Sequence, residues 1–430
     1  MEFQIFEEAM TDLSGGIDSQ RYEGRLFDRM RPGLDLRDEV QFEATLSTAD
    51  RLLRRVEGVR PLEEIESVLG SSPESWPLGA HLAVKLARSK ALLEKRSLPL
   101  HLTVVVPVYA EHERILRPGE HPLGEGFIDR KLRELEWLIG NRAGQSFELL
   151  IVDDGCPHGS GRIAEEILQS RHPEAPARVL YLFDAIEQEL PVTASMRSVD
   201  ESCKGGSIQL GLWDAVRKDR PGHVLIYTDA DLSTHLGQSG LLVAALDDEY
   251  ISIAAGSRRA KESVVVKSGQ RSARGRLFIY LWKKLLPELG YLEDTQCGFK
   301  AMSAETARRF SEAPSERGFA FDVELLLRCE LASRRSIATV PIAWIDSQEA
   351  STTVGLAPYL PMLRSIVRLY RENLLERPLS EAFARTIESL DETSWERAIE
   401  VLGPKLEEIN PALDRDVVHF SPRELMMAAT

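Results

Sequence analysis

Short apolar, β-branched runs alternate with helix-like segments through the middle of the chain, and this alternation constrains the fold more than any other feature. The expected strands cover residues 102–106, 147–155, 178–183, 223–227, 250–255 and 338–345. The helices expected between them cover residues 130–139, 161–170, 204–216 and 241–247. Such alternation is typical of parallel βαβ units with right-handed crossovers. We therefore expect an α/β fold, a sheet flanked by helices.

The expected strand at 223–227 leads into a pair of acids, in the stretch HVLIYTDADLS. Asp229 and Asp231 would share one face of the strand if it continued that far, because side chains alternate along a strand. Open α/β sheets bind ligands at the carboxyl ends of their strands. Two close carboxylates repel each other unless a positive group lies between them, and a divalent cation carrying phosphate oxygens fits that need. The alternative is one acid that caps a helix near Leu236 and one that is merely solvated.

Composition excludes several classes of protein. The chain has 430 residues and a net charge of −15, which allows two or three domains and argues against nucleic-acid binding. Its four cysteines are far apart and form no CxxC pair, which argues against a zinc site or a disulfide framework. The acidic N-terminus lacks the layout of a signal peptide, and no run of eighteen apolar residues occurs. A cytoplasmic location is expected.

The loops after the expected strands carry the chemistry. VPVYAE (106–111) contains no glycine pair, unlike the G-x-G-x-x-G turn of dinucleotide-binding proteins, and no GxxxxGK[ST] motif occurs. Asp153 and Asp154 lie at the end of the second expected strand and could accept hydrogen bonds from a nucleotide base or ribose, or act as turn or helix-capping acids. Lys204 and the glycines after it could cradle a phosphate at a helix start.

Positive charge gathers at residues 258–276 of this acidic chain, where arginines could bind phosphate esters or form a solvated loop. Segments 277–286 and 358–376 are amphipathic, and core packing, a solvated face or peripheral contact with a membrane would each suit them. The first 98 residues look helical and could serve packing, homo-oligomerisation or regulation. We expect a helical N-terminal extension (1–98), a central domain (99–346) and a helical C-terminal segment (347–430).

Seven stretches in one collinear order resemble motifs of the family-2 nucleotide-sugar glycosyltransferases, which have the GT-A fold, a Rossmann-like mixed sheet flanked by helices. The most specific are DTQCGFKAM (294–302) and GFAFDVELL (318–326). VPVYAE, VDDG, KGGSIQLG, YTDADLS and GSRRAKES add weaker matches, the fourth as the family's D-x-D. The resemblance covers roughly residues 100–350. It is greatest to the branch of dolichyl-phosphate glucosyltransferases and polyprenol-phosphate mannose synthases.

The resemblance implies roles for matching positions in this chain. Asp229 and Asp231 would hold Mg²⁺ or Mn²⁺ on the donor diphosphate, with Ala230 between them in the donor site. The remaining donor-binding residues would be Pro107, Tyr109, Glu111, Asp153 and Asp154 at the nucleotide, and Lys204, Arg258 and Arg271 at the phosphates.

The chain also departs from the family pattern. Ala110 and Cys156 replace an asparagine and a serine, and Ser233 stands where the mannose synthases carry a metal-ligating glutamine. In IDSQEAST (345–352), Ser351 matches the family but a lysine is missing, which weakens an inferred clamp on a phosphate acceptor. No transmembrane anchor is expected.

The expected activity is metal-dependent, inverting transfer of a hexose from a nucleoside diphosphate sugar, such as UDP-glucose or GDP-mannose, to a polyprenyl phosphate. A small hydroxyl acceptor is the alternative and would need a general base, for which Asp294 is the first candidate and Asp322 the second. A sugar nucleotidyltransferase is a rival enzyme, although it would want a glycine-rich first loop. A non-catalytic sensor of nucleotide sugars, with residues 1–98 as its partner-binding module, is the rival from another class.

Overall fold

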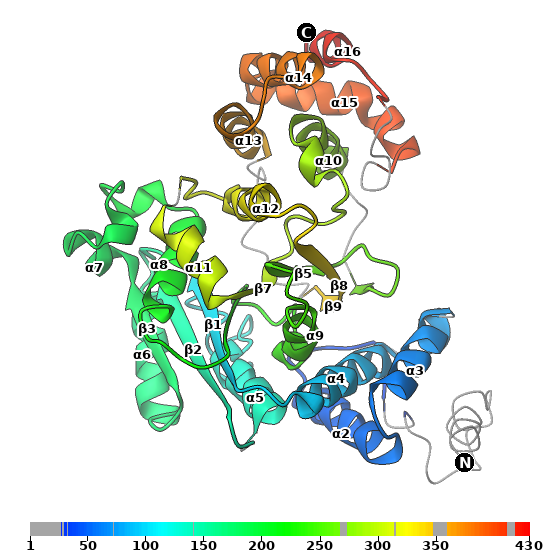
Figure 1. Cartoon of the computed structure of the whole chain (residues 1–430), viewed down its shortest axis with the longest axis vertical. Helices are drawn as coiled ribbons and strands as arrows, with labels where there is room; N and C mark the ends of the chain where they lie inside the picture. The colour runs from blue at the N-terminus through cyan, green and yellow to red at the C-terminus, as the bar shows by residue number, and fades with distance from the viewer. Residues whose placement is uncertain are drawn as a thin grey trace.

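A seven-stranded mixed sheet lies at the centre of the computed structural model (Figure 1), in the order β3-β2-β1-β4-β7-β5-β8. The structure describes residues 27, 30–31, 33–71, 73–140, 142–266, 273–313, 315–346, 359–410 and 418–430. The strands of the sheet are β1 (Leu100–Val108), β2 (Gln145–Asp153), β3 (Ala177–Tyr181), β4 (His223–Thr228), β5 (Ile253–Ser257), β7 (Phe299–Ser303) and β8 (Ile337–Pro341). β7 runs antiparallel to β4 and β5, and the other neighbours pair in parallel.

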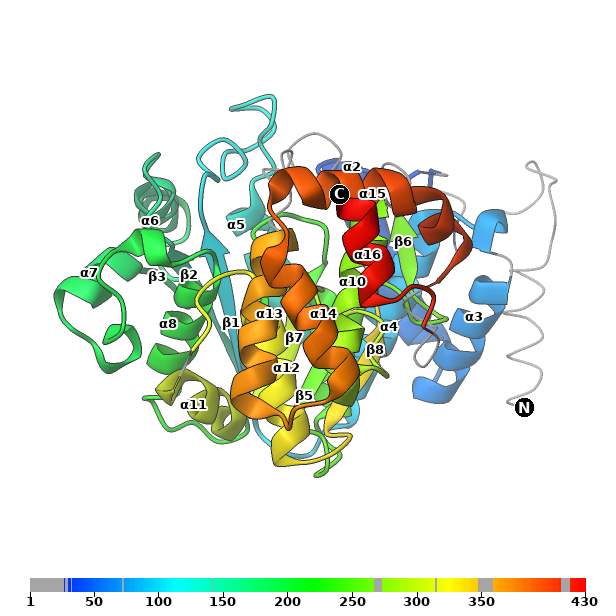
Figure 2. The same ribbon diagram turned by 90° about the horizontal axis from the view of Figure 1, so that it is seen from above.

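Alternation along β1 explains the two layers of core on either side of the sheet. All nine residues of β1 are buried. Val105 faces one core with Val152 and Leu225, whereas Val104 and Val106 face the other. The first core is covered by α8 (Gly205–Ala215), α11 (Ala304–Glu312) and α12 (Phe321–Ala332), and the second by α5 (Phe127–Ile139), α6 (Ser160–Arg171) and α9 (Ser239–Ala245). Figure 1 shows the two groups on opposite sides of the sheet, and α8, α11 and α12 can be followed from above in Figure 2. The expected α/β sheet flanked by helices is confirmed.

The N-terminal helices form an additional layer on the second face of the sheet. They are α2 (Glu39–Arg55), α3 (Val59–Ser71) and α4 (Leu78–Lys95), and α4 contacts α5 and α9. The buried Lys85 ammonium pairs with Glu66 and donates to the Pro341 carbonyl at 3.3 Å. The Ser89 hydroxyl accepts from the Gly240 amide at 2.8 Å. These contacts join the layer closely to the sheet domain.

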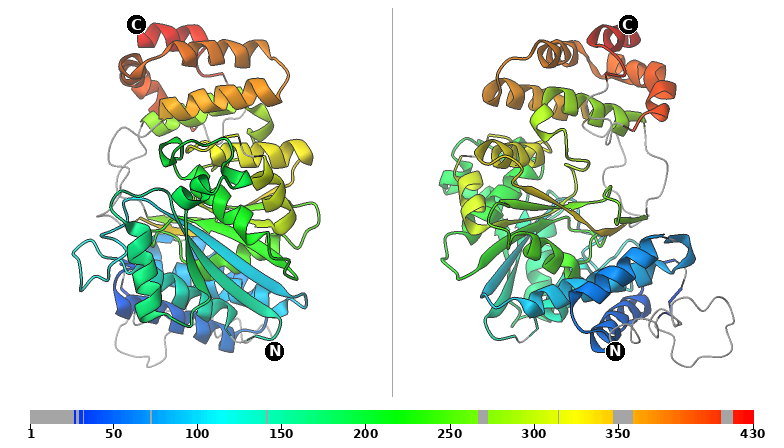
Figure 3. Two further views of the ribbon diagram at one scale, coloured as in Figure 1. Left: turned by 90° about the vertical axis from the view of Figure 1, so that its left-hand side faces the viewer. Right: turned by 45° about the vertical axis from the view of Figure 1, so that its right-hand side comes forward.

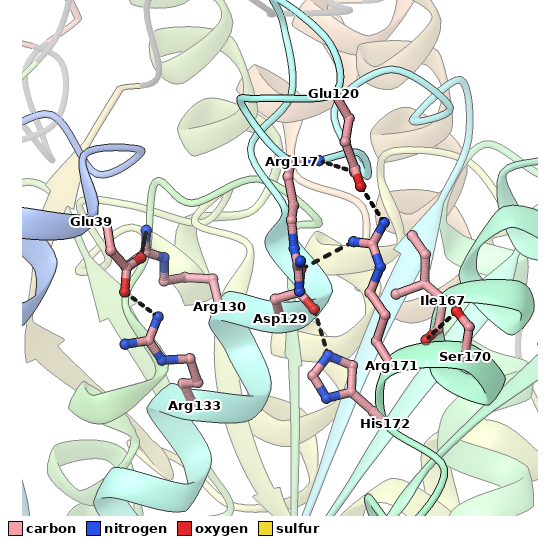
Figure 4. Close-up of polar contacts among 10 residues, drawn as sticks. All are labelled: Glu39, Arg117, Glu120, Asp129, Arg130, Arg133, Ile167, Ser170, Arg171 and His172. Carbon is pink, nitrogen blue, oxygen red and sulfur yellow. Dashed lines mark hydrogen bonds and ion pairs between the residues drawn. The ribbon is translucent and has the colours of Figure 1, made fainter.

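Ion pairs fix the surroundings of α5 on two sides (Figure 4). Toward the N-terminal layer, Glu39 lies 3.2 Å from Arg130 and 2.5 Å from Arg133. Toward α6, Asp129 binds Arg117, Arg171 and His172, and Glu120 binds Arg171 at 2.5 Å. The second group anchors the long connection between β1 and α5, which leads past the carboxyl end of β4.

The C-terminal helices pack around α10 at one end of the molecule (Figure 3). These helices are α10 (Ala273–Leu285), α13 (Tyr359–Asn373), α14 (Pro378–Ser389), α15 (Glu392–Glu408) and α16 (Pro422–Ala429). Every residue from Leu277 to Leu285 is buried, so this part of segment 277–286 serves core packing rather than a membrane face. Arg274 pairs with Glu396, and Arg276 donates to main-chain carbonyls of α15.

Several boundaries differ from the sequence-based expectation. The strand expected at 338–345 is divided at Ile342 into β8 and β9 (Ala343–Ile345), and β9 pairs with β6 (Val264–Val266) in a separate two-stranded sheet. β7 was not expected, because its residues lie inside a polar motif, yet four of its five residues are buried. Among the described residues, the remaining elements are the short helices α7 (Leu182–Glu187), η1 (Pro73–Ser75), η2 (Pro191–Thr193), η3 (Val199–Glu201), η4 (Leu236–Gln238) and η5 (Pro287–Leu289). No helix among the described residues is sufficiently long and apolar to cross a bilayer.

Candidate active site

The two acids of the DAD stretch lie directly beyond the carboxyl end of β4. The strand ends at Thr228, and Asp229 and Asp231 follow it on either side of the buried Ala230. Protein surrounds both carboxylates closely, but solvent reaches them, since 39% of the Asp229 side chain and 23% of the Asp231 side chain is exposed. A pair of accessible acids at this position can bind a cation or a donor hydrogen.

Lys204 is the direct cationic partner of Asp229. Its ammonium binds Asp229 Oδ1, and its main-chain amide donates to Asp154 Oδ2 at 2.7 Å. Lys204 precedes α8 with a φ of 72°, a left-handed conformation that is strained for a residue with a side chain. Burial raises the pKa of Asp229, but the adjacent Lys204 charge more than offsets this and leaves the pKa below its ordinary value.

Glycine at position 298 is required by the position of Asp229. A Cβ atom added to Gly298 would lie 2.4 Å from Asp229 Oδ2, closer than real Cβ contacts allow. Gly298 belongs to the DTQCGFK stretch, which leads into β7 beside β4. The antiparallel β7 therefore brings this motif against the acid pair.

Three groups hold Asp231: two from other parts of the chain and one from its own turn. Lys131 Nζ on α5 donates to the Asp231 carbonyl oxygen at 2.8 Å, and the Ser233 amide donates to Oδ1 at 3.0 Å. Arg114 Nη1 lies 3.9 Å from Oδ2. Burial and the charge of Asp229 raise the pKa of Asp231.

Asp294 is fully engaged by Arg258. The guanidinium forms two hydrogen bonds of 2.8 Å to the carboxylate, and the Arg258 amide adds a third of 3.0 Å. Burial raises the pKa of Asp294, but Arg258 outweighs it and holds the pKa well below its usual range. A carboxylate so paired is a weak base, and this arrangement weighs against Asp294 as a general base.

Asp322 occupies a buried network beneath the sheet. Its Oδ1 accepts from Lys300 Nζ at 2.6 Å and from the Tyr227 hydroxyl. Lys300 also donates to the Cys297 carbonyl at 2.7 Å, next to Gly298. Through Lys300, Asp322 therefore supports the loop that carries Gly298, which is a structural role.

The expected nucleotide-binding residues fall into different environments. Pro107 is buried within β1, whereas 54% of Tyr109 is exposed beyond it. Both oxygens of the buried Glu111 accept from Arg114, at 2.6 and 2.5 Å. Asp153 accepts from main-chain amides of 155, 156 and 161, so it shapes the turn into α6.

Asp154 and the first glycines of α8 both contact Ser202, in the segment that leads into α8. Asp154 accepts from the Ser202 hydroxyl at 2.6 Å, and burial raises its pKa. The Gly206 amide donates to Ser202 Oγ and to the Arg317 carbonyl, so this amide of the expected phosphate cradle is already engaged. Arg271 lies outside the described residues, as do residues 347–352 of the IDSQEAST stretch.

Sequence reasoning did not find Arg114, Lys131 or Gly298 as site residues. Arg114 lies three residues after Glu111, a spacing that could have suggested an ion pair. Gly298 was inside a recognised motif. Lys131 gave no signal, because its segment reads as an ordinary amphipathic helix.

The donor set fits a magnesium-like cation bound together with a phosphate ligand. Within the residues that the structure describes, no cluster of three or more His, Cys, Asp or Glu side chains could hold a metal. Mg²⁺ commonly binds through one or two carboxylates and completes its shell with substrate phosphates and water. Asp229 and Asp231 supply such a pair, and the buried Ser233 hydroxyl beside them has no hydrogen-bond partner among the described residues.

Comparison with known proteins gives the relationships of the chain. No protein-family model matches it. The dolichyl-phosphate beta-glucosyltransferase of Mus musculus is 29% identical over 275 residues, which cover 62% of this chain and 74% of that protein. The Homo sapiens enzyme of the same name is 29% identical over 276 residues, with the same coverage. The chain is a distant homologue of the dolichyl-phosphate beta-glucosyltransferases. This homology confirms the family resemblance seen in the motifs, and these homologues are hexosyltransferases.

The chain also aligns with a solved structure. Glucosyl-3-phosphoglycerate synthase from M. tuberculosis aligns with a TM-score of 0.40 and 20% identity, over 68% of this chain and 87% of that one.

Proposed function

We propose that the protein is a metal-dependent, inverting glycosyltransferase that moves a hexose from a nucleoside diphosphate sugar to a polyprenyl phosphate. The observation that carries the proposal is the accessible pair Asp229 and Asp231, placed beyond β4 next to Lys204 and closed off by Gly298. Distant homology to dolichyl-phosphate beta-glucosyltransferases supports it.

The side chains around the acid pair would divide the work of binding the donor. Asp229 and Asp231 would hold Mg²⁺ or Mn²⁺, which, when bound, supplies positive charge to the departing diphosphate. Lys204 would exchange its contact with Asp229 for a donor phosphate oxygen, because its ammonium is a flexible point charge. Asp153 and Asp154 would fix the loops near the nucleotide, and Tyr109 would offer an exposed ring to the base.

The state of the two candidate bases supports a phosphate acceptor. Arg258 binds both oxygens of Asp294, and Asp322 is buried with Lys300 bound to its Oδ1, so both carboxylates already serve buried cation contacts rather than standing open to a hydroxyl acceptor. A phosphate acceptor already carries an anionic oxygen near neutral pH and needs only to be positioned. The general-base roles of Asp294 and Asp322 stay predictions for the alternative of a small hydroxyl acceptor.

The test is a release assay with purified full-length protein. A panel of UDP- and GDP-sugars is incubated with Mn²⁺ and a polyprenyl phosphate in detergent, and nucleoside diphosphate and pyrophosphate are measured separately. We expect release of nucleoside diphosphate and formation of a glycosylated lipid. Pyrophosphate release would instead indicate a nucleotidyltransferase, and donor binding without turnover on any acceptor would indicate a sensor.

Variants connect this assay to the site. Asp229→Asn and Asp231→Asn should abolish Mn²⁺-dependent binding of the nucleotide and turnover, because each removes a charged ligand. Asp248→Asn is the matched control, since Asp248 is exposed in the loop between α9 and β5, before the amino end of β5. Wild-type activity in either site variant would refute the proposal.

A further inference from the structure

Lys131 is a buried cation beside the acid pair. It lies on α5, is only 1% exposed and donates from Nζ to the Asp231 carbonyl at 2.8 Å. One turn later, the buried Glu134 accepts from the Leu236 amide at 2.8 Å. Two neighbouring turns of α5 therefore hold both ends of segment 231–236, which begins with the second acid.

A hydrogen bond to one carbonyl does not explain a lysine at this position. An ammonium group has three donors, and burying its charge is costly unless nearby negative charge offsets it. Burial lowers the pKa of Lys131, and the charges of Glu134, Asp231 and Asp229 limit this fall. The hydrogen bond to the Asp231 carbonyl places the Lys131 ammonium beside the acid pair, where its positive charge acts on both carboxylates.

We propose that Lys131 is a positioning residue whose charge makes the acid pair favour a divalent cation that arrives with a nucleoside diphosphate over the same cation alone. This inference rests on the proposed function. A fixed ammonium repels a bare cation, and it attracts the diphosphate that accompanies a bound one. Lys131 thereby keeps the two carboxylates close together before the donor arrives, without holding a metal in advance.

Binding of Mn²⁺ to the full chain tests this without measuring turnover. Free Mn²⁺ is followed by electron paramagnetic resonance in the absence and presence of UDP or GDP. Lys131→Met should bind Mn²⁺ alone about three- to tenfold more tightly than wild type, and should bind Mn²⁺ with nucleotide more weakly by a similar factor. Lys131→Gln keeps an N–H group for the Asp231 carbonyl but loses the charge, so it should show the same reversal.

A second buried lysine provides the control. Lys284 is also buried, at 8% exposed, but lies on α10, which packs against the C-terminal helices, so Lys284→Met should leave both Mn²⁺ affinities at their wild-type values. If Lys131→Met does not fold, Lys131→Gln carries the test alone.

The outcomes separate this inference from the proposed function. Unchanged affinities in the Lys131 variants, or a loss of both affinities in parallel, would show an ordinary structural role and overturn the inference. Failure of wild type to bind Mn²⁺ even with nucleotide would overturn the proposed function and this assignment together.

Discussion

Gly298→Ala is the most direct test of the acid pair, because it moves one carboxylate without changing any charge. The added Cβ would lie 2.4 Å from Asp229 Oδ2 and 2.6 Å from Asp229 Cγ. Ordinary contact begins at 3.4 Å, so the carboxylate has to retreat by about 1 Å. A displacement of this size at a reacting centre can cost about 100-fold in rate.

The fold should tolerate this substitution. The backbone of Gly298 lies outside the left-handed region, so alanine adopts it without strain. Overpacking typically costs about 1–3 kcal/mol, and the loss of glycine's freedom in the unfolded chain returns about 0.4–1 kcal/mol. We therefore expect a folded protein with a small change in free energy of unfolding.

The assay compares Mn²⁺-dependent nucleotide affinity, donor turnover and thermal melting of Gly298→Ala with those of Gly403→Ala. A Cβ at Gly403, in α15, meets nothing within 4 Å, so this control should keep wild-type activity. If Gly298→Ala bound and turned over the donor like wild type, the reasoning that places Asp229 in the site would be refuted.

Three other changes have definite expected outcomes. Asp294→Asn should lower turnover with a phosphate acceptor without a new pH optimum, because its carboxylate orients a guanidinium rather than taking a proton; a rate that shifts to higher pH would contradict this. Burial depresses the pKa of both His101 and His223 to about 4, so the unfolded chain takes up protons first and stability is lost as pH falls from about 6.5 to about 4. Between these two pH values, denaturant unfolding should show the free energy of unfolding fall by about 3 kcal/mol for each histidine. The fall should be smaller in the double variant His101→Gln/His223→Gln, and an equal fall in that variant would contradict the prediction. Phe42→Ala should cost about 3–5 kcal/mol in the same measurement, because the ring is 2% exposed, whereas Val40→Ala, 72% exposed on the same helix, should cost little.

The sequence predicted the sheet well where strands are short and apolar on both faces. β1, β2 and β4 lie at the expected positions, because a strand buried on both sides reads as a continuous β-branched run. β7 could not be predicted in this way, since Lys300 lies within it and appears polar. Lys300 is buried only because Asp322, from a helix 22 residues away, provides its charge partner.

The sequence predicted which acids lie at the site better than it predicted which of them a ligand can reach. The acids at 229, 231, 294 and 322 were all identified from motifs, yet solvent reaches the first two, whereas the last two are buried and bound by cations. Which cation reaches which acid depends on tertiary packing, for example of β7 against β4, and no local pattern encodes it.

The N-terminal layer explains why the burial of Lys131 was not predicted from the sequence. A helix on the face of an α/β sheet usually keeps one side in solvent, and a lysine in it is then expected on that side. Here the α2–α4 layer covers α5, and Phe42 lies over the Arg130 guanidinium at 3.8 Å, so Arg130, Lys131 and Glu134 are all at most 6% exposed. The layer thus changes the dielectric surroundings of charges on α5, and the strength of any effect of Lys131 on the acid pair depends on it. Phe42→Ala should loosen this layer and therefore bring the ratio of the two Mn²⁺ affinities, with and without nucleotide, closer to the ratio in Lys131→Met. If Phe42→Ala lowered the free energy of unfolding but left this ratio unchanged, the dependence on the layer would be contradicted.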